Sequence, residues 1–376
     1  MKIVYWGTYD KSRERYRILI DAFQQNGIDI FECHEDVWSD IRDKSMISSG
    51  RSRLRICTKY IVSYLKLIFR YILLPNHDAV FIGYLGHFDV LVLWPFAKLR
   101  RKPIVWDAII SLYDTVVSDR KMVPASHPFA RLLFLIEWLS AHSANRILLP
   151  SNARASNFTL RYGLVEGKAR GVFLGVEANV FPNKLKESKA TTENDFLSVV
   201  FYGQFIPMHG VDTIVHAARL MRKAQVKWTI IGSGQVQRTI RELLEERPLP
   251  LLTWIPWISY TELSAWIHRA DVALGIFGDS EKATTSIPNK VFQILSTGTP
   301  LITRDSPAIR EILSPTMPGI YLVPPNSPRA LVAAINRFRS DRQLLSQMDL
   351  HSEVKNLFQP VVIGNQIACL IDECLS

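Results

Sequence analysis

The stretch "SIPNKVFQILSTGTPLITRD", Ser286 to Asp305, has the pattern of a loop, a short helix and a buried strand in succession. Serine and proline precede the helix, Lys290 and Gln293 occupy its first turns, and "STGTP" ends it. A helix N-terminus presents unpaired N–H groups and a partial positive charge, so it attracts phosphate. We therefore interpret this helix as a phosphate-binding element and expect further ligand-facing residues at the ends of neighbouring strands.

The bulk properties are those of a globular chain with more than one domain. The 376 residues exceed what one hydrophobic core usually holds, so two domains are expected. Hydrophobic residues make up 48% and charged residues 21%, a composition that excludes a disordered chain. The N-terminal "MKIVYWG" has no separate apolar signal region and is interpreted as a first strand.

The cysteines and the short motifs give no sign of a metal site. The four cysteines have no metal-ligand spacing and fit a reducing cytosol better than a disulfide framework. They are Cys33, Cys57, Cys369 and Cys374. Because the sequence contains neither a DxD triplet nor an HExxH motif, we predict no metal and no cofactor.

Strand-length apolar runs alternate with helical patterns along most of the chain, which predicts an α/β fold with parallel sheets. In the first half, strands are expected at 2–7, 28–33, 78–84, 102–109, 146–151 and 171–176, and helices at 12–26, 53–74, 88–101, 128–144 and 152–162. In the second half, strands are expected at 196–204, 226–234, 251–257, 272–277, 300–305 and 319–325, and helices at 209–223, 235–247, 259–269, 288–297, 306–313 and 327–340.

Two doubly wound sheets joined by one linker account for this alternation. The polar stretch 183–196, which has no periodicity, is the predicted linker. It separates a domain over 1–182 from one over 197–342, and helical patterns in 343–376 are expected to pack back on the first domain. Ligands bind at the carboxyl ends of the strands in such folds, so two facing sheets would form a cleft.

Candidate binding residues follow four strands of the second half. They are Gln204, His209 and Gly210 after the first strand, Gly232, Ser233 and Gly234 after the second, Trp257 after the third, and Ser286, Asn289, Lys290 and Gln293 after the fourth. Each has an ordinary alternative: a helix-terminal histidine, tight glycine turns, packing tryptophans at 254 and 257, or a solvated lysine. Their occurrence at successive strand ends of one sheet favours a binding site.

The second half resembles the donor domain of GT-B-fold glycosyltransferases of the family 4 type, which are retaining and metal-independent. The resemblance covers most of 199–325, and the first half matches in outline only. It is carried by "FYGQFIPMHGVDTIVHAARLM", "WTIIGSGQ", "ADVALGIFG" and "IPNKVFQILSTGTPLITRDSPAIREIL". It implies two Rossmann-like domains, a hexosyltransferase activity, and a nucleotide-sugar donor bound by the second domain and an acceptor bound by the first.

The chain departs from this family pattern at three positions. A glutamate that holds the nucleotide ribose is Gln293 here, and an acidic residue eight positions earlier is Thr285. A glutamine can still hydrogen-bond ribose hydroxyls. The basic residue before the glycine of the first donor-domain helix is His209, which the resemblance makes a candidate catalytic group that donates to a diphosphate oxygen, more strongly if protonated.

In the first half, Gly7 and Asp107 are the candidate site residues. The loop that contains Gly7 corresponds to the GT-B loop that approaches the sugar, although the glycine is also explained by a tight turn. Asp107 follows a strand directly and is a candidate to orient an acceptor hydroxyl or the donor sugar. The nearby Asp114 and Asp119 share this possibility, with helix capping or pairing to Arg120 as the alternative.

The segment 51–74 has the pattern of a basic amphipathic helix. Residues 1–200 contain 28 Lys and Arg against 20 Asp and Glu, whereas 201–376 contain 17 against 15. Apolar residues recur at helical spacing in the segment, which holds no acidic residue, so it is predicted to dock on an anionic membrane surface or acceptor. Its cations are Arg51, Arg53, Arg55, Lys59, Lys66 and Arg70. A core helix with a solvated basic side is the alternative.

Two other interaction classes are disfavoured. The apolar stretch 79–97 is as long as a bilayer span, but it contains Asp89 and His87 and divides into strand, loop and helix. No nucleic-acid motif accompanies the positive charge.

Together with the family resemblance, which implies transfer with retention, the sequence predicts a glycosyltransferase at the cytoplasmic face of a membrane. It would move a sugar from a nucleotide-diphosphate sugar to a glycan or lipid-linked acceptor in cell-surface polysaccharide biosynthesis. Two alternatives remain: a GT-B-fold sugar-nucleotide epimerase, and a catalytically silent homologue that acts as a binding partner.

Overall fold

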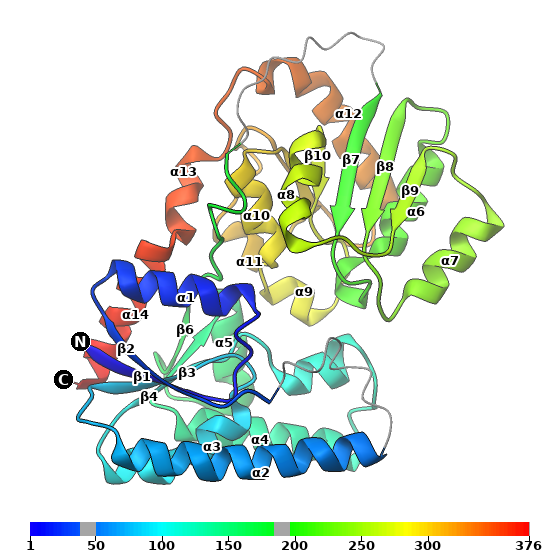
Figure 1. The fold of residues 1–376 in the computed structure, drawn as a ribbon. Coiled ribbons are helices and arrows are strands. Elements are labelled where there is room, and N and C mark those ends of the chain that lie inside the picture. Colours follow the sequence, from blue (N-terminus) through cyan, green and yellow to red (C-terminus); the bar gives the residue numbers. More distant parts are fainter. Residues whose placement is uncertain (38–49, 184–195, 376) are drawn as a thin grey trace. The chain divides into compact units, whose positions relative to one another are not determined.

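A computed structural model describes residues 1–37, 50–183 and 196–375, and the side chains of 51–57 are not described (Figure 1). Nearly all of the predicted linker lies outside these ranges. The chain divides into two compact units. Unit 1 comprises Met1–Val117, Lys121–Phe173 and Pro360–Ser376, and unit 2 comprises Ser118–Arg120 and Leu174–Gln359.

Unit 1 contains a six-stranded parallel sheet in the order β2-β1-β3-β4-β5-β6. Its apolar runs form central strands that are buried on both faces, as parallel sheets require. The strands are β1 (Lys2–Gly7), β2 (Asp29–His34), β3 (Ala79–Ile82), β4 (Ile104–Asp107), β5 (Arg146–Leu149) and β6 (Ala169–Gly171). The strand predicted at 171–176 is wrong in its bounds. The strand is Ala169–Gly171. Val172 N still donates to the Leu149 carbonyl (2.7 Å), and the carbonyl of Phe173 then accepts a hydrogen bond from Arg15 (2.8 Å).

Helices cover both faces of the unit 1 sheet. They are α1 (Glu14–Gln25), α2 (Gly50–Leu73), α3 (His87–Leu99), α4 (Pro128–Ser143), α5 (Asn152–Tyr162) and α14 (Pro360–Leu375). Helix α14 packs against α1, and the two share one core cluster. Figure 1 shows α2, α3 and α4 together on the other side of the sheet, where α3 packs against both neighbours. The sequence did not predict the π-helix η2 (Asp114–Asp119).

Unit 2 contains a second six-stranded parallel sheet in the order β12-β11-β10-β7-β8-β9. The strands are β7 (Leu197–Tyr202), β8 (Val226–Ile231), β9 (Leu252–Ile255), β10 (Val272–Leu274), β11 (Leu301–Arg304) and β12 (Ile320–Val323). The helices are η3 (Pro207–His209), α6 (Val211–Leu220), α7 (Gln237–Glu246), α8 (Tyr260–Arg269), α9 (Glu281–Thr285), α10 (Asn289–Thr297), α11 (Pro307–Arg310), α12 (Pro328–Leu345), α13 (Ser352–Lys355) and η4 (Asn356–Phe358).

The predicted fold class is confirmed, because both sheets are doubly wound and parallel with flanking helices. Strand order reverses between β1 and β3 in unit 1, and between β7 and β10 in unit 2. In doubly wound sheets, ligands bind outside the carboxyl ends of the strands at such a reversal. The order of strands therefore identifies one candidate site edge in each unit.

Candidate functional site

Two loops lie together at the carboxyl edge of the unit 2 sheet. The first runs from Gly203 through η3, and the second begins at Gly275, after β10. A backbone hydrogen bond from Phe277 N to His209 O (3.1 Å) joins them. Because β7 and β10 flank the reversal of strand order, these loops lie where a doubly wound sheet binds its ligand.

The N-terminus of α10 presents backbone N–H groups at this edge. Its N-cap residue is Pro288, which makes no side-chain capping bond, and Ser286 and Asn289 beside it are half-buried. The helix is buried from Lys290 to Thr297, so it is fixed in the core of the unit. A fixed helix N-terminus without a side-chain cap is suited to accept an anion.

Lys290 is a buried cation in the first turn of α10. Its side chain is 5% exposed, and its Nζ lies 4.0 Å from the centroid of the Phe201 ring. In the part of the chain that the structure describes, Nζ has no hydrogen-bond partner. Burial lowers the pKa of Lys290 well below its ordinary value. An ammonium group held in this way is stabilised by any ligand that brings a negative charge.

His209 differs in protonation from the sequence expectation. Its ring Nδ1 donates to the carbonyl of Gln204, so the proton is on Nδ1. Burial, followed by the charge of Lys290, lowers the pKa of His209 well below its usual value, which favours the neutral ring. A neutral ring with its proton on Nδ1 offers Nε2 as a hydrogen-bond acceptor. His209 is therefore suited to accept a bond from a ligand hydroxyl rather than to donate to a phosphate.

Two glycines allow the close approach of these groups. Gly203 has φ +136°, and a Cβ there would lie 2.9 Å from Lys290 Nζ and 3.1 Å from His209 Cε1. A Cβ on Gly232 would lie 2.0 Å from the carbonyl oxygen of Gly203. The neighbouring Ser233 accepts a backbone hydrogen bond from Phe205 (2.9 Å). The glycine loop after β8 thus supports the β7 loop by backbone contact.

Three further residues predicted to bind the donor are Gly210, Gly234 and Trp257. Gly210, with φ +60°, joins η3 to α6, and Gly234 is exposed in the loop after β8. Trp257 is 76% exposed, so its ring is accessible. The other tryptophan considered, Trp254, stacks on Phe205 with ring centroids 5.5 Å apart and donates to the Gly232 carbonyl (2.8 Å). Trp254 is therefore a packing residue.

Neutral groups occupy the two positions where the resembled family has carboxylates. Gln293 is buried, and its Oε1 accepts a hydrogen bond from the Tyr202 hydroxyl (3.0 Å). Thr285 is also buried, and its hydroxyl donates to the carbonyl of Glu281 (3.0 Å). Both side chains are thus oriented by internal hydrogen bonds.

Arg304, at the end of β11, was not among the residues predicted from the sequence. This buried side chain donates to the carbonyl of Gly278 and to the hydroxyl of Thr284 (3.2 Å). Burial lowers the pKa of Arg304. Arg304 holds the β10–α9 loop in place. Its position, as a charged residue at the end of an otherwise apolar run, could have indicated it in the sequence.

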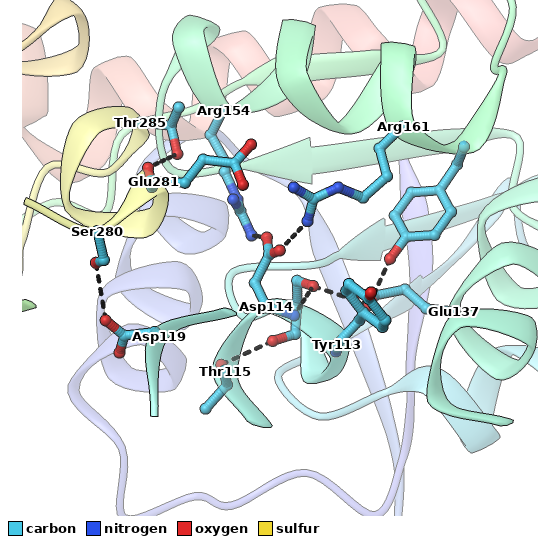
Figure 2. A network of polar contacts seen from close by, with 12 residues as sticks. Tyr113, Asp114, Thr115, Asp119, Glu137, Arg154, Arg161, Ser280, Glu281 and Thr285 are labelled. Atoms are coloured by element: carbon cyan, nitrogen blue, oxygen red, sulfur yellow. Dashed lines mark hydrogen bonds and ion pairs between the residues drawn. The ribbon is translucent and has the colours of Figure 1, made fainter. Parts of the chain in front are cut away.

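Asp119 and Ser280 lie together in unit 2 and also shape this loop (Figure 2). Ser280 is the N-cap of α9, and its hydroxyl donates to Asp119 Oδ1 (2.8 Å). Gln235 donates to the carbonyl of Arg120 (2.8 Å). The short segment 118–120 is therefore fixed against the loops of unit 2, an arrangement that the sequence did not reveal.

In unit 1, Asp107 forms a buried ion pair. Its two carboxylate oxygens accept from Arg15 Nε (3.1 Å) and Nη2 (2.9 Å), and both side chains are almost fully buried. With both oxygens bonded to one guanidinium, Asp107 is poorly placed to take a proton from a substrate. The ion pair connects α1 to the end of β4, which gives Asp107 a structural role, and its role toward a substrate stays a prediction.

A second buried network fixes the segment that follows β4. Asp114 is ion-paired with Arg154 and Arg161, as Figure 2 shows. Glu137 accepts hydrogen bonds from four groups: His87, Ser111, the Tyr113 backbone and Tyr162. Burial would raise the pKa of Glu137, but these bonds, led by that from His87, outweigh it and the pKa is lowered. The ion pairs of Asp114 with Arg154 and Arg161 thus hold the segment after β4 against α5.

Gly7 lies at the reversal of strand order in unit 1. A Cβ there would lie 2.2 Å from Asp89 Oδ2. The Asp89 carboxylate accepts from the backbone and hydroxyl of Thr8 (2.9 and 3.0 Å) and from the Tyr64 hydroxyl (2.8 Å). Burial raises the pKa of Asp89 to about 6, although these bonds oppose the shift. Gly7 thus makes room for the Asp89 carboxylate, whose hydrogen-bond partners Thr8 and Tyr64 both belong to unit 1.

Helix α2 exposes the apolar face that the sequence predicted. Ile61, Leu65 and Ile72 are 61%, 65% and 55% exposed, whereas Leu67 and Tyr71 on the opposite side are buried. Lys66 and Arg70 are also exposed, and both pair with Glu35. Lys59 is half-buried, and the side chains of Arg51, Arg53 and Arg55 lie outside the described set.

The described residues contain neither a candidate membrane-spanning helix nor a candidate metal cluster. Within residues 1–37, 50–183 and 196–375, no helix combines the length and apolarity needed to cross a bilayer. The same ranges contain no group of three or more His, Cys, Asp or Glu side chains arranged to hold a metal ion.

Part of the second half is similar in sequence to known proteins. Residues 197–341 match a family described as "Glycosyl transferases group 1". The chain is also 27% identical over 141 residues to a putative colanic acid biosynthesis glycosyl transferase, WcaI, of Escherichia coli K12. That match spans 37% of this chain and 34%, about a third, of the relative.

Solved structures share the whole fold. A sucrose-phosphate synthase from Thermosynechococcus elongatus has a TM-score of 0.72 at 16% identity, with 99% of this chain and 98% of that one covered. HepE of Anabaena, in complex with UDP and glucose, has a TM-score of 0.67 at 14% identity, with 99% and 100% covered. A lipopolysaccharide outer core galactosyltransferase, WaaB, has a TM-score of 0.62 at 14% identity, with 99% of both covered. This likeness shows a GT-B-like fold.

Proposed function

We propose that the protein is a glycosyltransferase that takes a sugar from a nucleotide-diphosphate sugar. The glycosyl transferase family match coincides with unit 2, which carries the candidate site. The single observation that carries the proposal is Lys290, a buried cation without a partner among the described residues, next to the N-terminus of α10. A diphosphate supplies the negative charge that both groups attract.

In this proposal, unit 2 acts on the leaving group. Lys290 and the α10 N–H groups stabilise the negative charge that develops on the diphosphate when the glycosidic bond breaks. These groups supply the positive charge without a metal. The neutral His209 accepts a hydrogen bond through Nε2 from a sugar hydroxyl, and Gln293 exchanges its bond with Tyr202 for one to the ribose. The relatives in complex with UDP or UDP-glucose support a nucleotide-sugar donor.

Transfer with retention, of the family 4 type, is the proposed stereochemistry. Neither Thr285 nor Gln293 can form a glycosyl-enzyme ester, because neither carries a carboxylate. The proposed route is therefore attack of the acceptor on the same face as the departing diphosphate, which gives the retained product. The protein's contribution is then positioning and charge stabilisation.

The proposed acceptor is a glycan or a lipid-linked glycan of cell-surface polysaccharide biosynthesis. Two similar proteins are named for colanic acid biosynthesis and for the lipopolysaccharide outer core. The exposed apolar and cationic side chains of α2 support action at an anionic membrane surface. The free thiols Cys33, Cys369 and Cys374 fit the cytoplasmic side of that membrane.

A catalytically silent homologue that binds nucleotide sugars is the second candidate. It is favoured by the replacement of both family carboxylates by neutral side chains. Prolonged incubation with the bound nucleotide sugar separates the two candidates, since a transferase without an acceptor hydrolyses its donor slowly and a silent binder does not.

The proposal is tested by a thermal-shift panel of UDP, GDP, ADP and dTDP and their glucose conjugates. A ligand that binds only the folded protein raises its melting temperature. We expect one nucleotide to stabilise the protein and its sugar conjugate to be transferred, with the anomeric configuration of the product read by NMR. The absence of stabilisation by every member of the panel would overturn the proposal.

A further inference from the structure

Unit 1 contains a cavity of about 550 Å³ at the edge of its sheet where β4 and β5 begin. This edge is opposite to the carboxyl edge that holds Gly7 and Asp107. The walls come from the C-terminal parts of α3 and α4, the turn 101–103 and the loop 165–168. The cavity therefore belongs neither to the candidate donor site nor to the carboxyl edge of unit 1.

The cavity is strongly basic. Among the described residues, its lining contains five lysines and arginines and one carboxylate, Glu166. The cations are Lys98, Arg101, Lys102, Arg146 and Lys168. Such a concentration of positive charge around one concave surface attracts anions.

Two of these cations are half-buried and lie close enough to affect each other. Burial, followed by the charge of Arg146, lowers the pKa of Lys168. Arg146 is ion-paired with the half-exposed Glu373 (3.2 Å), but its Nε is buried and hydrogen-bonded to no described group. A bound anion would accept from this N–H and offset the repulsion between the two side chains.

Helix termini explain only part of this charge. Cations stabilise the C-terminus of a helix, and Lys168 donates to the carbonyl of His142 at the end of α4 (2.8 Å). Arg101 and Lys102 lie beyond the end of α3, and neither forms an ion pair within the described parts of the chain. The described residues thus provide no negative partner for Arg101 and Lys102, so we assign these two cations to ligand binding.

The surroundings indicate a lipid rather than a soluble anion. Trp94, which lines the cavity beside Lys98, is 39% exposed, and Leu99 is 84% exposed. Helices α2 and α4 pack against α3 on this side of the sheet (Figure 1). Both helices also expose large apolar side chains. They are Ile61, Val62, Leu65, Phe69, Ile72 and Leu73 on α2, and Phe129, Leu132, Leu135 and Leu139 on α4. Tryptophan with lysine is typical of a membrane–water interface.

We propose that this cavity binds the phosphate of an anionic phospholipid headgroup, while the exposed apolar side chains of α2, α3 and α4 contact the bilayer. The inference rests on the membrane-surface part of the proposed function and names the lipid that unit 1 recognises. It adds a specific headgroup site to the general attraction between a basic helix and an anionic surface.

The experiment compares two variants of the full chain that lose the same charges. Arg101→Gln/Lys102→Gln removes the cations of the cavity, and Arg222→Gln/Lys223→Gln removes an adjacent, exposed Arg–Lys pair from unit 2. Co-sedimentation is measured with phosphatidylcholine vesicles with and without 30% phosphatidylglycerol. We expect the cavity variant to bind phosphatidylglycerol vesicles about 10- to 30-fold more weakly than wild type, on the basis of the attraction per cation near such a surface. The control variant should bind as wild type does.

Competition separates a lipid headgroup from a free phosphate. Inorganic phosphate should weaken wild-type vesicle binding more than sodium chloride at the same ionic strength, and it should have no such extra effect on the cavity variant. Equal losses in the two double variants would overturn the headgroup site and indicate diffuse attraction. Phosphate binding to the cavity without any change in vesicle binding would overturn the lipid as occupant.

The same samples show whether the donor-site proposal fails separately. Nucleotide stabilisation by the panel above should be equal in wild type and both double variants, because unit 2 carries that site. Wild type that ignores phosphatidylglycerol vesicles but is stabilised by a nucleotide would overturn the lipid site alone.

Discussion

The two sheets hold their buried cations in different ways. In unit 1, Arg15 is 6% exposed and bonded through two nitrogens to Asp107 at the end of β4. In unit 2, Lys290 is 5% exposed and has no hydrogen-bond partner among the described residues. A buried charge is costly unless it is paired. We therefore interpret the paired Arg15 as a structural group, and the unpaired Lys290 as a group that awaits a ligand of opposite charge.

The glycines at the two reversals of strand order repeat this contrast. Gly7 makes room for Asp89, whose oxygens are satisfied by Thr8 and Tyr64. Gly203 makes room for Lys290, which the described chain leaves unsatisfied. Unit 1 thus fills the position where doubly wound sheets bind ligands with its own groups, and unit 2 does not.

The largest expected effect is a loss of stability when Arg15 loses its partner Asp107. Asp107→Ala leaves Arg15 buried and unpaired, so we expect it to lower the free energy of unfolding by about 3–5 kcal/mol. Urea unfolding measures this. The double variant Arg15→Met/Asp107→Leu should recover much of the loss, because it removes both charges. A loss below about 1 kcal/mol in Asp107→Ala would show that the ion pair is not a structural element of unit 1.

The next effect concerns pH and Asp89. Its pKa is raised to about 6 in the folded protein, compared with about 3.9 in an unfolded chain. The folded state therefore binds more protons between these values, so the stability contributed by this group is present below about pH 4 and is lost as pH rises to 6. Two pKa units correspond to about 3 kcal/mol.

The Asp89→Asn variant tests this sign. The free energy of unfolding of wild type relative to the variant should fall by about that amount between pH 4 and pH 7. The lowered pKa of Glu137 acts in the opposite direction, but it is present in both proteins and cancels. Parallel pH profiles for the two proteins would refute the raised pKa of Asp89.

Proton uptake on nucleotide binding further distinguishes the unpaired Lys290 from the paired Arg15. Burial depresses the pKa of Lys290, and a bound diphosphate should raise it again by direct attraction. At pH values above the lowered pKa of Lys290, nucleotide binding should therefore be accompanied by uptake of a proton. In the same pH range, the affinity for the nucleotide should fall by up to about tenfold per pH unit. Calorimetry in buffers of different ionisation enthalpy measures the uptake. Equal uptake by wild type and Lys290→Met would assign the proton to another group.

The smallest effect concerns Gln293. Gln293→Ala should weaken binding of the stabilising nucleotide by about 0.5–1.5 kcal/mol, the value of an ordinary hydrogen bond. Gln293→Glu should be tolerated, because a carboxylate also accepts from Tyr202 and lies three residues from Lys290 on one helix. Unfolding of Gln293→Glu would show that the position is closed core rather than part of a binding site.

The elements with strong periodicity were predictable from sequence, and those set by distant contacts were not. Helix α5 was predicted at its observed bounds, because a capping serine precedes it and Gly163 in the left-handed conformation follows it. The π-helix η2 and the short helix α9 have no periodic pattern of their own. They are fixed by the buried anchors Asp114 and Asp119.

The candidate site was predictable in position but not in chemistry. Strand ends indicated Lys290 and His209, and the structure brings both close to Gly203. The neutral ring of His209 depends on burial and on the nearby Lys290, and its tautomer depends on the Gln204 carbonyl. A sequence shows none of these. The partner of Asp107 is Arg15, 92 positions away, so only the folded chain reveals the pair. Helix α2 is apolar on two faces, and sequence alone could not tell which face is packed.

The central claim is that Lys290 is held for an anionic ligand rather than for stability. Lys290→Met, with the exposed Lys223→Met as control, tests it through two quantities: the free energy of unfolding and the dissociation constant of the stabilising nucleotide. We expect unchanged or higher stability, because a buried unpaired charge is removed. We also expect nucleotide binding weaker by about 1.5–3 kcal/mol, roughly ten- to 150-fold. Unchanged nucleotide affinity in Lys290→Met, or a large loss of stability, would contradict a role of Lys290 in binding an anion.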